Sequence, residues 1–245
     1  MYPENELTKR KNFKFIPNFV INALGNTLYR SACPSHETLK STESDPNALV
    51  ERVDKVFDKL VAQVKEEYPS TRNIPWEIRV KKDSNLRAFS CPGGKVCITT
   101  GILAMLEKEG EINNTQLEDL IAAALSHEIA HVVAGHSSKR TQSSLFLDLL
   151  AHLAEQMKIE DLFYKVIKNV CAIPFFQQKD HRQANEFEAD RFGIEIAHKA
   201  NYNIGTSVVL QKIFLKLQET TFSHPPCDER LQENQKTINR LKREN

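Results

Sequence analysis

The sequence predicts an α+β fold that is mostly helical, with a small sheet or hairpin beside the helix that carries its chemistry. Apolar residues recur at helical spacing over most of the 245 residues. The period changes to two only from Trp76, where Trp76, Ile78 and Val80 alternate with charged residues. A second β-branched run covers 96–100, and the Pro92-Gly93-Gly94 turn precedes it.

The composition describes a folded chain with one core. The 40% hydrophobic and 27% charged residues are typical of a folded chain. A domain of this length can bury roughly 70–75% of its unfolded surface, so stability requires no metal. The net charge of +1 gives no electrostatic case for nucleic acid as a partner. The five scattered cysteines favour a reduced, intracellular compartment, and Cys91 and Cys97 lack the second pair that a zinc clip needs.

The chain divides into an N-terminal extension, 1–45, and a main domain, 46–245. We expect the extension to pack on the main domain or to gate it, with 35–45 as a polar linker. No apolar stretch reaches the 18 residues of a membrane span, and the first dozen residues lack the composition of a transit peptide. A membrane contact is therefore expected to be peripheral at most, through 13–21 or 145–153, although the second run is more typical of core packing.

Each helix is indicated by its own start signal or apolar spacing. Asp45-Pro46 supplies a cap and a first-turn proline for a helix that ends at Tyr68-Pro69. A short apolar turn is expected at 101–106, and Thr115 to Glu118 form a capping box for a helix running towards Gly135. Further helices are expected over 145–153, 162–170, 186–197, 206–218 and from 228 to the end of the sequence.

The residues that indicate chemistry are His127-Glu128-Ile129-Ala130-His131, inside the helix that the capping box starts. Positions four apart share one helix face, so the two imidazoles can hold one metal ion. Glu128 can then act as a general base towards water at that metal. This pattern is typical of a zinc hydrolase.

A catalytic zinc needs a third protein ligand. The metzincin arrangement requires glycine at 134 and histidine at 137, where this chain has Ala134 and Ser137. A glutamate from a later helix is the alternative, and Glu186 fits, with Asp190 four residues on to fix the tautomer of a ligating histidine. Glu188 points away from Glu186 and is expected to be solvated.

Four ordered segments, spread over about 76–232, resemble the Ste24/HtpX-like zinc metallopeptidases, and within them the mitochondrial branch whose activity overlaps the m-AAA protease. The segments are 88–96 with 100–103, 125–136, 186–193 and Ser223-His224-Pro225. The resemblance implies a zincin-type domain in which His127, His131 and Glu186 bind zinc and Glu128 is the base. It also implies a mitochondrial, inner-membrane-associated location, the alternative being cytoplasmic.

The chain departs from the family pattern at two positions. Family members tend to have asparagine directly before Ala88-Phe89, where this chain has Arg87, and arginine three residues before the ligand glutamate, where it has Gln183. Many members are also integral membrane proteins.

Two further histidines, His136 and His224, each have two possible roles. His136 is expected to support the site from behind the ligands or to cap the helix, the alternative being simple surface exposure. His224 either reaches the site, to donate to an oxyanion or to cap the metal, or is a structural turn residue. The other histidines have no partner at ligand spacing.

These observations together predict a zinc-dependent metalloendopeptidase that hydrolyses unfolded or extended protein segments, in quality control or regulatory processing. Substrate backbone is expected to add to a sheet edge at Ala88, Phe89 and Ser90 or at 96–99. The rival interpretation is a non-catalytic, zinc-stabilised adaptor, although structural zinc sites usually have four ligands rich in cysteine. The sequence does not indicate an oligomeric state.

Overall fold

The computed structural model describes residues 5–9, 17–39, 48–112, 116–139, 141, 178–217 and 228–244. Within these residues the fold is mostly helical with one small sheet, which confirms the predicted α+β class. The expected helices over 145–153 and 162–170 and the residue His224 lie outside the described residues. In chain order the elements are α1 (Asn18–Ala32), η1 (Ser35–Glu37), α2 (Leu49–Glu67), η2 (Pro69–Thr71), β1 (Glu77–Lys81), β2 (Ala88–Cys91), β3 (Lys95–Thr99), α3 (Thr100–Ile112), α4 (Leu117–Val133), α7 (Gln178–Lys199), α8 (Thr206–Leu217) and α9 (Asp228–Glu244).

The sheet has three strands in the order β1-β3-β2. β2 and β3 form the antiparallel hairpin predicted around the Pro-Gly-Gly turn, with Ser90 opposite Val96, whereas β1 runs parallel to β3, with Glu77 opposite Lys95. β3 is therefore the central strand, and all five of its residues are buried. The expectation that substrate could add at 96–99 is wrong, because both edges of β3 are already paired. β2 is the edge strand beside α4.

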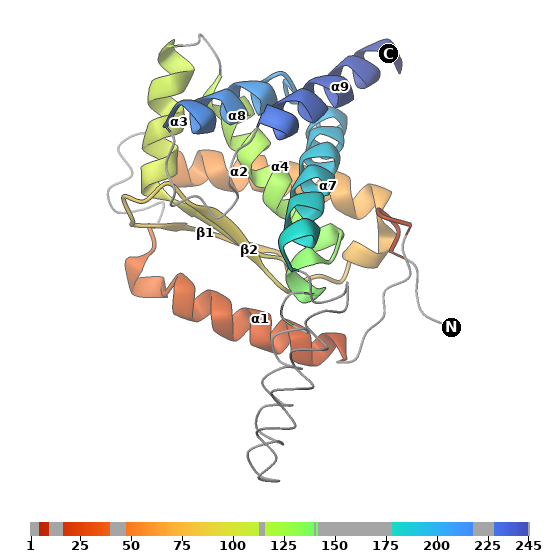
Figure 1. Ribbon diagram of the computed structural model, residues 1–245. Helices are drawn as coiled ribbons and strands as arrows, with labels where there is room; N and C mark the ends of the chain where they lie inside the picture. Colours follow the sequence, from red (N-terminus) through yellow and green to blue (C-terminus); the bar gives the residue numbers. More distant parts are fainter. Residues whose placement is uncertain are drawn as a thin grey trace, which may run out of the picture.

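Helices cover the sheet unequally, with α1 on one face and the other described helices on the opposite face (Figure 1). Buried contacts attach α1 to the central strand. The Tyr29 hydroxyl donates a hydrogen bond of 2.8 Å to the Val96 carbonyl, and the Cys33 thiol lies 2.9 Å from the Cys97 thiol, sulfur to sulfur. This part of the N-terminal extension thus packs on the sheet.

The expected polar linker also contacts the sheet where the structure describes it. Ser35–Glu37 forms a 3₁₀ turn, and the Leu39 amide donates to the Val80 carbonyl at 2.9 Å. Thr38 forms an isolated bridge with Lys81. The chain therefore runs along the outer edge of β1, opposite the edge that β2 provides.

The core is built around α4, which is buried on nearly every side. Three consecutive alanines favour the helix and allow its neighbours to approach closely. Most apolar residues at its other positions are buried, and so is the apolar face of α2 that packs against it. The fully buried members are Leu120, Ile121, Leu125 and Ile129 of α4 and Val53, Leu60 and Val64 of α2.

The structure corrects three predicted boundaries. α2 begins at Leu49, later than the Asp45-Pro46 signal indicated. α4 begins at Leu117, with Gln116 before it as the N-cap residue. This start is one residue later than the capping box indicated, and Thr115 of that box lies outside the described residues. The expected turn at 101–106 is instead the first half of α3, because its apolar residues are buried at helical spacing against the core.

No helix in the described part of the chain is long and apolar enough to cross a membrane.

Candidate metal centre

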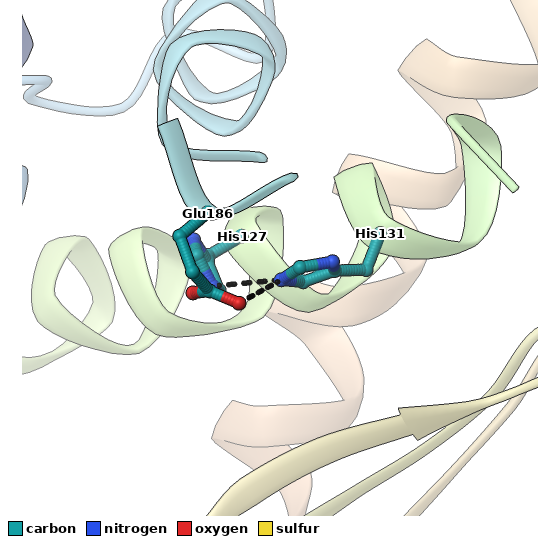
Figure 2. Close-up of side chains that lie close together, drawn as sticks. All are labelled: His127, His131 and Glu186. Atoms are coloured by element: carbon teal, nitrogen blue, oxygen red, sulfur yellow. Dashed lines mark hydrogen bonds and ion pairs between the residues drawn. The ribbon is translucent and has the colours of Figure 1, made fainter. Parts of the chain in front are cut away.

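Two helices bring three potential ligands together (Figure 2). His127 and His131 lie four residues apart on one face of α4, and Glu186 approaches them from α7. The Nε2 atoms of the two histidines are 3.1 Å apart. The Glu186 carboxylate places Oε2 at 3.3 Å from His127 Nε2 and Oε1 at 3.4 Å from His131 Nε2.

This donor set suits zinc in both chemistry and spacing. Two imidazole nitrogens and one carboxylate are the protein ligands of many catalytic zinc sites, which keep a fourth position for water or substrate. Ligand atoms about 2.0–2.1 Å from a tetrahedral zinc are separated from one another by roughly 3.3 Å. Among the described residues, His127, His131 and Glu186 are the group of metal-ligating side chains that could hold an ion.

A close crossing of α4 and α7 makes this convergence possible. Gly193 of α7 lies directly against the α4 backbone at the first histidine, where an added Cβ would be 3.0 Å from the His127 nitrogen. A side chain at that position would push the helices apart. Glycine therefore lets α7 approach near enough for Glu186, two turns earlier, to reach both imidazoles.

Behind His127 lies a buried ion pair. His127 Nδ1 is 2.9 Å from Asp190 Oδ1, and Arg230 of α9 donates to both carboxylate oxygens of Asp190 at 2.7 Å. Although burial by itself raises the pKa of Asp190, hydrogen bonds from Arg230 and His127 lower it overall. Arg230 also lies 3.5 Å from Glu186, so it is close to both carboxylates of α7.

Behind His131 lies a second chain of polar contacts. Gly135, with φ of +76°, ends α4, and the chain then turns back so that His136 Nδ1 is 2.9 Å from His131 Nδ1. His136 Nε2 lies 2.9 Å from Glu188 Oε2. Since an ionised carboxylate only accepts, His136 donates from Nε2 and accepts at Nδ1, which leaves His131 to donate from Nδ1.

Glu188 corrects a prediction. Its side chain is only 8% exposed and pairs with His136, whereas the sequence indicated a solvated position. The helical reasoning was right that Glu188 points away from Glu186. The segment after Gly135 packs against that side of α7 and buries Glu188. The sequence did not indicate that the chain turns back there.

The surroundings of His127 and His131 shift the pKa values of the two imidazoles in opposite directions. Burial by itself would lower the pKa of His127, but the adjacent Asp190 and Glu186 raise it to about 10. Burial lowers the pKa of His131 to about 4, because contact with Glu186 compensates only in part. Burial also lowers the pKa of His136, against the opposing effect of Glu188. His131 and His136 are thus neutral at pH 7, as the hydrogen-bond chain requires.

The remaining predicted residues surround this cluster. Glu128 is 2% exposed on α4 and lines the same pocket as His127 and Ala88. Ser90 is buried, with its hydroxyl 3.3 Å from that of Ser137, while Phe89 between them is half-buried. The structure therefore places strand β2 alongside the part of the chain that carries the histidines.

Sequence reasoning missed Arg230 and Glu188. Arg230 had a signal that could have found it, because it shares one helical face with Asn234, Ile238 and Leu241, all of them buried. A charged side chain at a core position of a helix implies a buried partner. Glu188 had no comparable signal.

A helix with two histidines four residues apart, a glutamate from a later helix and a small sheet alongside define the zincin class of metallopeptidase domain. The chain belongs to peptidase family M48, whose family model matches residues 47–238.

Individual relatives are distant. Mitochondrial metalloendopeptidase OMA1 of Saccharomyces cerevisiae is 26% identical over 82% of this chain and 56% of its own length. Its counterpart of the same name in Schizosaccharomyces pombe is 30% identical over 54% of this chain and 35% of its own. A putative beta-barrel assembly-enhancing protease of Vibrio cholerae is 26% identical over 65% of the chain and 31% of its own. The chain thus spans between about a third and just over half of these relatives.

Proposed function

We propose that this chain is a zinc-dependent metalloendopeptidase acting on unfolded or extended protein segments, in quality control or regulatory processing. The observation that carries the proposal is the convergence of His127, His131 and Glu186 next to buried Glu128. Membership of family M48 supports it.

In this proposal some residues bind the metal ion and others transfer protons. His127, His131 and Glu186 would hold the zinc ion, which when bound supplies a Lewis acid for the substrate carbonyl and for water. Glu128 would take the proton from the attacking water and deliver it to the leaving amine. His224 is proposed as a further polar group near the developing oxyanion.

Two pairs of residues would position the ligands. Asp190 forms an ion pair with His127 at Nδ1 and is held by Arg230, while His136 accepts from His131 Nδ1 and is held by Glu188. In both cases the contact at Nδ1 orients the ring so that Nε2 faces the metal position. The metal site would thus be oriented before the ion arrives. Zinc would have to displace the Nε2 proton that the raised pKa of His127 keeps on the ring at pH 7.

We propose the edge of β2 as the place where substrate backbone binds. An extended segment can add to an exposed strand through main-chain hydrogen bonds, which carry little side-chain selectivity. Ala88, Phe89 and Ser90 would form this strand, with Ala88 lining the pocket that also contains Glu128. Residues 46–245 would form the peptidase domain, with 1–45 as an extension packed on it.

The test is cleavage of an unfolded protein by the purified chain, with bound zinc measured on the same sample. Cleavage should stop with a chelator and return with added zinc. Glu128→Gln should retain one zinc per chain yet lose at least about 10²-fold in rate, because it removes the base but no ligand. Full activity in that variant would reject the mechanism.

The adaptor alternative gives a different result in the same assay, namely stoichiometric zinc without any cleavage. Location is a separate proposal. The names of the yeast relatives favour a mitochondrial site for this chain, with membrane contact at most peripheral. Release by alkaline carbonate would agree with that contact, and retention would contradict it.

A further inference from the structure

Three of the chain's five cysteines lie between α1 and the sheet. Cys33 directly follows the last turn of α1, Cys97 lies in the central strand β3, and Cys91 ends the edge strand β2. Cys33 and Cys97 are fully buried, and Cys91 is half-buried beside them. The metal centre uses none of these thiols, because α1 covers the opposite face of the sheet from α4 (Figure 1).

Two of the three thiols are positioned to bond to each other. The sulfurs of Cys33 and Cys97 are 2.9 Å apart, so a movement of roughly 0.9 Å would bring them to the bonded distance of about 2.05 Å. Cys91 is less well placed, because it lies opposite Lys95 across the hairpin, whereas Cys97 lies opposite Phe89. Such diagonal neighbours have Cα atoms about 7–8 Å apart, beyond the usual span of a disulfide.

The surroundings of this pair favour Cys33 as the nucleophile. The Cys97 thiol donates to the Cys33 sulfur, and Arg79 donates to the Cys33 carbonyl at 2.8 Å. The hydrogen bond from Cys97 lowers the pKa of Cys33. The positive charges of Arg79 and Lys81 add to this effect, against the opposing effect of burial. Because the thiolate is the species that attacks a disulfide, Cys33 would react first and Cys97 second.

We propose that Cys33 and Cys97 form a reversible disulfide, which fastens the N-terminal extension to the central strand when a low-molecular-weight disulfide oxidises the chain. The Cys33 thiolate attacks one sulfur of glutathione disulfide and releases the first glutathione. Cys97 then gives up its proton and attacks the Cys33 sulfur, which forms the protein disulfide and releases the second glutathione. Two electrons pass from the two cysteines to glutathione disulfide, and their two protons end on the two glutathione thiols. The inference does not depend on the proposed peptidase function.

The disulfide would make a non-covalent attachment covalent. In the reduced chain, packing and contacts such as the hydrogen bond from Tyr29 to Val96 hold α1, so the helix can open locally. The same opening would admit the oxidant, because both sulfurs are buried. The two cysteines are 64 positions apart, and a cross-link that closes a long loop stabilises the folded state more than one that closes a short loop.

The test uses the full chain, purified in the reduced form and equilibrated in native buffer with increasing ratios of glutathione disulfide to glutathione. After alkylation and proteolysis, we expect mass spectrometry to find one pair of peptides joined through Cys33 and Cys97. The melting temperature should rise by roughly 5–15 °C. Amide hydrogen exchange in α1 should slow by at least about tenfold. Dithiothreitol should reverse both changes.

Cys91→Ala is the matched control, because it removes the third thiol of the cluster and should leave the bond and both effects in place. Cys97→Ala should remove them, with Cys33→Ala as a second variant if the first fails to fold. Unmodified Cys33 and Cys97 at the most oxidising ratio would overturn the inference. A bond through Cys91, or a bond between Cys33 and Cys97 that leaves the exchange of α1 unchanged, would overturn it as well.

Discussion

Three acidic residues within one short stretch of α7 contact different parts of the metal centre. Glu186 faces the Nε2 atoms of both histidines, Asp190 meets His127 at Nδ1, and Glu188 reaches His131 only through His136. Their helical spacing explains the difference, because residues four apart share a face and residues two apart do not. Substitutions along α7 should therefore have graded effects.

The first prediction compares Glu186 with Glu188. Glu186→Ala removes a ligand and should abolish stoichiometric zinc, whereas Glu188→Gln should weaken zinc binding by roughly 10–100-fold, the usual effect of disturbing a residue that orients a ligand. Competition with a chromophoric chelator measures both. Glu195→Gln, at the α7 position that pairs with Arg240, is the control. Equal losses in the Glu186 and Glu188 variants would show that the ligand assignment is wrong.

For single residues, the sequence allowed the cluster of His127, His131 and Glu186 to be predicted, but not all of the residues that contact it. His127, His131 and Asp190 follow from spacing along single helices, which local geometry determines. The contact between Glu188 and His136 depends instead on the path of the chain after Gly135, and that path is set by packing. The role of His224 at the site stays a prediction, since this residue lies outside the described residues.

The contact between α7 and α9 includes a buried ion pair, Arg230 with Asp190, and an exposed one, Arg240 with Glu195. Arg230 and Asp190 are 3% and 5% exposed, whereas Arg240, bonded to Glu195, is 49% exposed. Arg230→Met should lower the free energy of unfolding by about 3–5 kcal/mol, because it removes both hydrogen bonds from Arg230 to the buried Asp190 carboxylate and leaves it with His127 alone.

The matched substitution Arg240→Met breaks the exposed pair between the same two helices and should change stability by at most about 1 kcal/mol. Urea unfolding of the metal-free proteins measures both effects. Similar values for the two variants would mean that Asp190 does not depend on Arg230.

The attachment of β1 to β3 should depend on pH. Burial by itself raises the pKa of Glu77, but its contacts with Lys95 and Arg79 outweigh burial and lower it. Because the pKa of Glu77 is lower in the folded protein than the value near 4.5 in the unfolded chain, its ionised form stabilises the fold at pH values above 4.5. This stabilisation is lost as the pH falls through the pKa that Glu77 has in the folded protein.

Glu77→Gln should therefore make stability less sensitive to pH below about 5. Thermal melts between pH 7 and pH 3 measure this, with the exposed α2 residue Glu66→Gln as control. If the melting temperature of Glu77→Gln fell with pH as much as that of the unsubstituted protein, the contacts of Glu77 with Lys95 and Arg79 would not contribute to stability.

Among the elements, those with long apolar periodicity were the most predictable. α2, α8 and α9 lie where the spacing indicated, and the hairpin follows from its Pro-Gly-Gly turn. α3 was mistaken for a turn because Gly101 stands at its start and only Ile102, Leu103 and Leu106 carry its helical pattern. The parallel pairing of β1 with β3 joins residues distant in sequence, which no local signal specifies.

For the whole molecule, zinc should couple the two halves of the metal centre, because His127 and His131 come from α4 and Glu186 from α7. A ligand that binds only the folded state stabilises it, by about 4.1 kcal/mol when the free ligand is a thousand times its dissociation constant. Added zinc should thus raise the melting temperature, and a chelator should reverse the rise. The same shift in Glu186→Ala would place the stabilising metal elsewhere.

The position of Arg230 late in the chain also has a consequence for biosynthesis. A ribosome makes α4 and α7 before it makes α9, so the histidines and Glu186 exist for a time without Arg230. During that interval Asp190 lacks the two hydrogen bonds that Arg230 donates, and His127 is its only charged neighbour. A complete centre is expected only once α9 has been made and has docked, so the candidate metal centre would be assembled last, after the rest of the domain has been synthesised.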